Sequence, residues 1–71
     1  MNKYGYEVII WWSQTDGCYL AEVPELPGCM ADGESLQEVA KEIEESIKIW
    51  IDVNTERGLA IPEPKGRLTY A

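Results

Sequence analysis

A single long amphipathic helix is the feature that most constrains how this chain can fold. Ser35 and Glu38 have the spacing of a capping box, which marks a helix start just after Gly33. From Leu36 onward, apolar residues follow the three-four spacing of one helical face: Leu36, Val39, Ala40, Ile43, Ile47, Trp50 and Ile51. We predict a helix of about 20 residues, roughly 30 Å long, that ends before Gly58 because glycine suits the position after a helix C-terminus.

The N-terminal part of the chain has the pattern of a β-hairpin. Residues 6–12 are rich in β-branched and aromatic side chains, which fit the pleated surface of a strand. A turn over 14–17 contains Gly17 and leads into a second alternating segment at 18–23. The short turn makes the two strands antiparallel neighbours.

A rigid connection separates this hairpin from a third strand. Pro24 and Pro27 each fix φ and lack a backbone donor, so the second strand cannot continue through them. We predict a short third strand over 29–32 and a brief final strand over 68–70. The fold class is therefore α+β, a three-stranded antiparallel β-meander with one long helix packed on one face.

Apolar residues on both faces of the first strand predict self-association. Ile9 and Trp11 point away from the face that the helix would cover. The 71 residues form one domain, 1–71, and a chain this short buries only roughly 60% of its unfolded surface, so its own core is marginal. We expect a homo-oligomer, a dimer by default or a tetramer, in which Ile9 and Trp11 lie in the contact.

The charge of the chain favours protein partners over nucleic acids. Its 13 acidic and 6 basic side chains give a net charge of −7, which repels phosphate backbones and attracts basic protein surfaces. Four acids are predicted on the solvent side of the helix and are our candidate partner-binding residues: Glu38, Glu42, Glu45 and Asp52. The plainer alternative is a solvated face that keeps the protein soluble.

The residue types present give little support for catalysis. The chain has no histidine, so Ser-His and Cys-His nucleophile pairs are impossible. Cys18 and Cys29 are too few for a zinc cluster, and Cys29 is more simply a small core residue than a redox thiol. We predict no enzyme activity, no metal, no cofactor and no membrane span, in a cytoplasmic protein with reduced thiols.

The segment from 17 to 33, Gly-Cys-Tyr-Leu-Ala-Glu-Val-Pro-Glu-Leu-Pro-Gly-Cys-Met-Ala-Asp-Gly, closely resembles the HicB-like antitoxin family. The resemblance extends through the helix cap to the Ile-Pro-Glu-Pro segment at 61–64, nearly the whole chain. The residues that carry the family pattern are Tyr19, Pro24, Leu26, Pro27, Gly28, Gly33 and Ser35.

The resemblance implies a partial ribonuclease-H-like fold that has lost its catalytic carboxylates, with 67–70 as its fourth strand. It also implies a role in a type II toxin–antitoxin system, in which the domain occludes a small basic HicA-type toxin that cleaves messenger RNA. Many HicB proteins continue into a DNA-binding domain; this chain ends at Ala71, so we do not expect DNA binding. The alternatives are an orphan oligomeric adaptor or small-ligand-binding module and, more remotely, a nuclease using Glu22 or Asp32.

Overall fold

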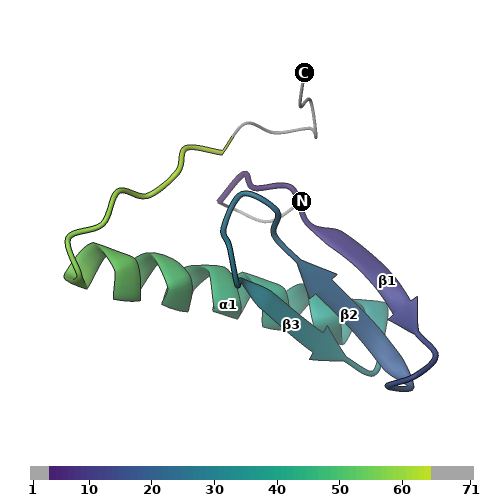
Figure 1. Ribbon diagram of the computed structural model, residues 1–71. Helices are drawn as coiled ribbons and strands as arrows, with labels where there is room; N and C mark the ends of the chain where they lie inside the picture. The colour runs from purple at the N-terminus through teal and green to yellow at the C-terminus, as the bar shows by residue number, and fades with distance from the viewer. Residues whose placement is uncertain (1–3, 65–71) are drawn as a thin grey trace.

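The computed structural model describes residues 4–64, which form an antiparallel sheet with a helix on one face (Figure 1). The elements are β1 (Ile9–Ser13), β2 (Cys18–Glu22), β3 (Met30–Gly33) and α1 (Leu36–Glu56). The sheet order is β1-β2-β3, and both pairings are antiparallel, so the predicted α+β meander is confirmed. The strand predicted over 67–70 lies outside the described residues.

β1 begins three residues later than predicted. Its first pairing joins Ile9 to Glu22, the last residue of β2. Pro24 follows two residues on and cannot donate to a ladder, so residues 6–8 have no partner strand there. Tyr6 instead packs into the core, 3% exposed, and its hydroxyl donates a hydrogen bond to the carbonyl of Pro62.

The core lies between α1 and the β2–β3 part of the sheet. It is formed by eight buried residues: Tyr6, Ala21, Val23, Leu26, Cys29, Val39, Ile43 and Ile47. Ala21 and Val23 alternate along β2, while Val39, Ile43 and Ile47 recur at four-residue spacing along α1. The two-residue period of the strand and the 3.6-residue period of the helix therefore direct these side chains into the same core.

Both ends of α1 are capped by the residues that the sequence indicated. The Ser35 hydroxyl accepts a hydrogen bond from the backbone N–H of Glu38 at 3.1 Å. The Glu38 carboxylate in turn accepts from the N–H of Glu34, one residue before the cap position expected for a capping box. At the other end Gly58 has φ +75°, and the Leu59 N–H donates to the Asn54 carbonyl at 2.9 Å, as in a Schellman motif.

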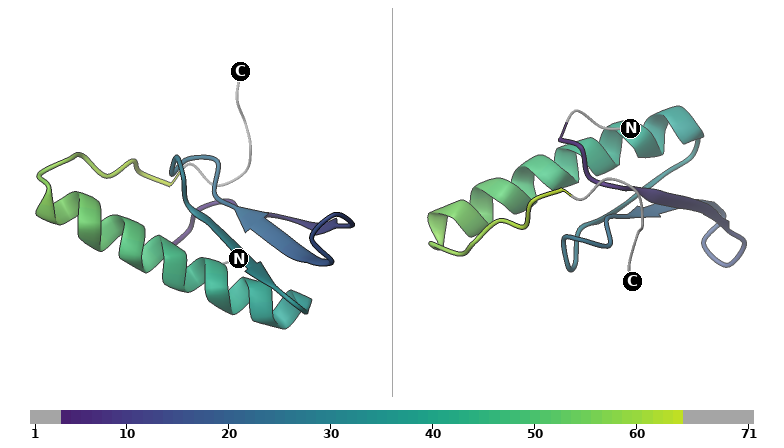
Figure 2. Two further views of the ribbon diagram at one scale, coloured as in Figure 1. Left: turned by 60° about the horizontal axis from the view of Figure 1, so that its bottom comes forward. Right: turned by 90° about the horizontal axis from the view of Figure 1, so that it is seen from above.

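The helix covers only part of one face of the sheet. α1 packs against β3 and β2, and the left view of Figure 2 shows β1 as the edge strand beyond β2. Ile10 and Trp12 lie on the same sheet face as Ala21, yet they remain 37% and 49% exposed. β1 is consequently apolar and exposed on both faces.

Candidate functional site

The Pro-Glu-Leu-Pro-Gly connection over 24–28 places one side chain, Leu26, in the hydrophobic core. Leu26 at its centre is fully buried, and its N–H donates to the Val23 carbonyl at 3.0 Å. Gly28 has φ +83°, a left-handed conformation that glycine adopts without steric cost. The indole N–H of Trp50 donates to the carbonyl of Pro27 at 2.9 Å and ties the connection to α1. These motif residues therefore serve the fold.

Gly33 allows α1 to approach β3 closely. A Cβ at this position would lie 2.6 Å from the backbone nitrogen of Val39 and 2.9 Å from its Cα. Tyr19, which pairs with Gly33 across the sheet, packs against the core and makes an edge-to-face contact with Trp12 at 5.0 Å between ring centroids. Gly33 and Tyr19 thus maintain the geometry of the helix on the sheet.

The four predicted partner-binding acids form an exposed stripe along α1. Glu38, Glu42, Glu45 and Asp52 are all exposed. At 100° per residue Glu38, Glu45 and Asp52 lie opposite the buried row of the helix, and Glu42 lies at its flank. The stripe covers roughly 21 Å of helix axis at 1.5 Å per residue. We call these four residues the acidic stripe.

The members of the acidic stripe differ in what they contact. Glu38 takes part in the N-terminal cap, and Asp52 forms an exposed ion pair with Lys48 at 3.2 Å. That hydrogen bond with Asp52 raises the pKa of Lys48 above its ordinary value. Within residues 4–64, the carboxylates of Glu42 and Glu45 make no hydrogen bond or ion pair, and the charge of Glu45 also acts on nearby Lys48.

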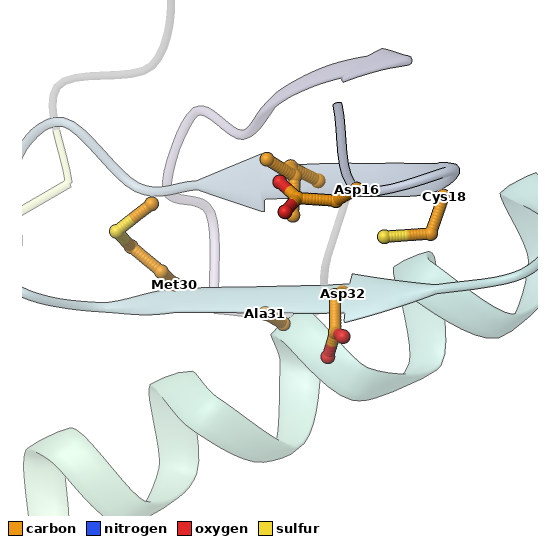
Figure 3. A pocket seen from close by; sticks show the side chains of 6 residues that line it. Asp16, Cys18, Met30, Ala31 and Asp32 are labelled. Atoms are coloured by element: carbon orange, nitrogen blue, oxygen red, sulfur yellow. The ribbon is translucent and has the colours of Figure 1, made fainter. Parts of the chain in front are cut away.

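A second acidic surface lies on the sheet face opposite α1. An open depression of about 550 Å³ is lined by Asp16, Cys18, Leu20, Met30, Ala31 and Asp32. Figure 3 shows Asp16 entering from the turn before β2, and Met30 and Asp32 from β3. Apolar side chains border the depression beside two carboxylates, an arrangement that suits the aliphatic stem and charged head of a lysine or arginine. We call it the open-face depression.

The electrostatic field in the open-face depression is negative. Desolvation of the Cys18 thiol, followed by the nearby charges of Asp32, Asp16 and Glu34, raises the pKa of that thiol. Sequence reasoning missed this surface because Asp16 and Asp32 are far apart in the chain, and only the pairing of β2 with β3 brings the turn that holds Asp16 to the same surface as Asp32. The alternation of Cys18 and Leu20 along the second strand was the only sequence signal that apolar side chains lie on this face.

The other predicted positions are placed as follows. Ile9 and Trp11 are 36% and 37% exposed on the open sheet face, as expected from their alternation. Cys29 is a core residue, and burial raises the pKa of its thiol. Both cysteines are free thiols.

The part of the chain that the structure describes holds neither a cluster of metal ligands nor a membrane-spanning helix. Between residues 4 and 64 there is no group of three or more metal-ligating Asp, Glu, Cys or His side chains. In the same range no helix is both long and apolar enough to cross a bilayer. Glu22 and Asp32, the nuclease candidates, lie on the same open face in adjacent strands, through the pairs Glu22–Met30 and Leu20–Asp32.

Comparison with known proteins gives a consistent family result. The family model described as UPF0150-like matches residues 1–62. A UPF0150 protein of Archaeoglobus fulgidus is 40% identical over 45 residues, covering 61% of this chain and 65% of its own length. UPF0150 proteins of Synechocystis and Thermoplasma acidophilum are 36% and 37% identical, covering 73% and 80% of this chain and 74% and 81% of their own. No solved structure matches significantly.

Proposed function

Because the chain belongs to the UPF0150-like family and carries the HicB-like pattern at 17–33, we propose that it is an antitoxin-like protein-binding domain. Its partner is a small basic toxin of the HicA type, which it neutralises by occluding the surface that would otherwise bind messenger RNA. In this proposal the domain is not an enzyme, binds no nucleic acid itself, and acts in the cytoplasm as part of a type II toxin–antitoxin system.

The observation that carries the proposal is the exposed acidic stripe on α1. A protein that competes with RNA for a basic surface needs negative charge facing outward, and the stripe presents four carboxylates along one side of a rigid helix. Rows of charge of this kind accelerate association with an oppositely charged partner, and the effect weakens as salt rises. The open-face depression offers a second acidic surface to the same partner.

Charge reversal at the centre of the stripe tests the proposal. Glu42→Lys/Glu45→Lys changes two exposed carboxylates that make no hydrogen bond or ion pair within residues 4–64. Glu56→Lys/Glu63→Lys changes the net charge by the same amount at exposed positions outside both the acidic stripe and the open-face depression and is the matched control. Binding of each protein to the purified basic product of the adjacent gene is measured by calorimetry at two salt concentrations.

We expect the stripe variant to bind at least about 10-fold more weakly and with a smaller salt dependence, while the control changes by less than about 3-fold. Equal losses in both variants would mean that only net charge matters and would refute a role for the stripe. An Asp16→Lys/Asp32→Lys variant reports in the same assay whether the open-face depression contributes. Relief of toxin-induced growth arrest, retained by the control and lost by the stripe variant, gives the cellular readout.

The second candidate is an orphan oligomeric adaptor or small-ligand-binding module of the same fold. In this function the ligand would bind in the open-face depression, where Leu20 and Met30 lie beside Asp16 and Asp32. The neighbouring open reading frame separates the two functions: a short basic chain with a single histidine supports the antitoxin, and its absence supports the orphan module. Nuclease activity requires RNA cleavage with Mg²⁺ or Mn²⁺ that is lost on mutating Glu22 or Asp32.

A further inference from the structure

The part of the chain that forms the sheet carries acidic residues and no basic one. Residues 4–35 hold β1, β2, β3 and the turns between them, and they contain no lysine, arginine or histidine. The acids of this range are Glu7, Asp16, Glu22, Glu25, Asp32 and Glu34. Within residues 4–64 the basic side chains all belong to α1 or the residue directly after it: Lys41, Lys48 and Arg57. Lysines of the same helix therefore offset part of the charge of the acidic stripe, whereas nothing in the sheet offsets its own.

The open-face depression combines this negative charge with apolar side chains. Leu20 pairs with Trp11 on β1 and with Asp32 on β3, so the three side chains form one row on the open face. Met30 lies in the next row and is 52% exposed. Leu20 and Met30 line the depression beside Asp32, and Asp16 reaches it from the turn before β2 (Figure 3). A long basic side chain placed here would contact carbon along its stem and carboxylates at its end.

We propose that the open-face depression binds an arginine side chain of the basic partner protein. The aliphatic stem of the arginine lies against Leu20 and Met30, and its guanidinium group meets the carboxylates of Asp16 and Asp32. The inference rests on the proposed function for the identity of the partner. It adds the residue type that the sheet recognises and the surface that recognises it.

The chemistry of the depression favours a guanidinium group over other cations. Guanidinium is more weakly hydrated than ammonium, so it loses less on leaving water for a surface bordered by Leu20 and Met30. Desolvation, and then the charges of Asp32 and Asp16, raise the pKa of the Cys18 thiol, so the fields of both carboxylates reach the same point in the depression. A metal ion would need more ligands, and residues 4–64 group no three that could hold one.

The depression and the acidic stripe can be tested separately because they lie on opposite sides of the domain. α1 packs on one face of the sheet, and the depression opens on the other. The acidic stripe lies on the side of α1 that faces away from the core. A substitution in one surface therefore leaves the residues of the other unchanged.

Titration of the isotope-labelled full chain with N-butylguanidinium, at constant ionic strength and followed by NMR, tests the site. This probe has the stem and the head group of arginine. We expect saturable shifts centred on the N–H groups of residues 16–20 and 30–32, with a dissociation constant of about 20 mM, as expected for a ligand of this size. N-butylammonium and the guanidinium ion without a stem should each bind at least about 3-fold more weakly.

Single substitutions separate the contribution of charge from that of apolar contact. Asp32→Asn should weaken N-butylguanidinium binding at least about 5-fold. Glu56→Gln removes the same charge at an exposed position at the end of α1 and should leave binding unchanged. Met30→Ser should weaken N-butylguanidinium about 3-fold and leave the guanidinium ion unaffected, because only the former has a stem to contact Met30. We expect the same order of losses with the purified basic product of the adjacent gene.

Several results would overturn the proposal. These are shifts spread along α1, equal affinity for N-butylammonium, and equal losses in Asp32→Asn and Glu56→Gln. Tighter probe binding by Lys65→Gln/Arg67→Gln would also overturn it, because a basic side chain of this chain would then already occupy the depression. Partner binding that depends on the acidic stripe, without any probe binding, overturns this inference and leaves the proposed function standing. Probe binding in a chain that has no basic partner does the reverse.

Discussion

Replacing Gly33 with alanine tests whether close approach of α1 to β3 sets the geometry of the domain. The added methyl carbon would lie 2.6 Å from the Val39 nitrogen, 2.9 Å from its Cα and 3.0 Å from the Glu38 carbonyl carbon. Ordinary contact begins at 3.4 Å, so α1 or β3 has to move by about 0.8 Å. All three atoms are backbone, and no side-chain rotation relieves the overlap.

The expected loss follows from two opposing effects. Forcing a methyl group into a well-packed contact costs about 1–3 kcal/mol. Alanine also restricts the unfolded chain, which returns about 0.4–1 kcal/mol. We expect Gly33→Ala to lower the free energy of unfolding by about 1–2 kcal/mol, a large part of the ~3–5 kcal/mol available to a domain of this size.

Urea unfolding followed by circular dichroism measures the loss, and a size series identifies its cause. Steric overlap predicts that Gly33→Ser and Gly33→Val cost progressively more than Gly33→Ala. At Gly58, where φ is +75° and nothing lies within 4 Å, alanine and serine should cost about the same, ~1 kcal/mol, because only backbone strain is involved. A Gly33→Ala protein within 0.5 kcal/mol of the wild type, measured against the scatter expected of surface changes, would refute the reasoning.

Three further predictions concern other contacts of the fold. Trp50→Phe removes the indole donor to Pro27 and should cost about 1 kcal/mol in the same urea assay; an unchanged midpoint would contradict this. Ser35→Ala removes the helix cap and should also cost about 1 kcal/mol, with Ser35→Asp restoring stability. Both thiols have raised pKa values, so iodoacetamide at pH 8 should modify each more slowly than free cysteine. Mass spectrometry should find Cys29 slower than Cys18, because Cys29 is buried; the reverse order would disprove this.

Local features of the fold were predictable because their causes are local. The Ser35 cap, the Gly58 terminator and the buried row of α1 depend on hydrogen bonds and spacings within a few residues. The break at Pro24 is equally local, because proline itself lacks the donor that a strand needs. The sequence by itself thus determined the α+β class, the order of the elements and which acids of α1 face outward.

The tertiary structure decided how far the helix covers the sheet, and with it the surfaces available to partners. Nothing in the alternation of residues 6–12 indicates that α1 lies over β2 and β3 and leaves β1 exposed, because that placement depends on the crossing of packed elements. The open-face depression likewise needs the β2–β3 register to bring Asp16 and Asp32 to one surface. The alternation of side chains in the sequence predicts which face of the sheet each residue points to. Whether that residue is buried depends on which other segments pack beside it, and segments that are distant in the sequence meet only in the folded chain.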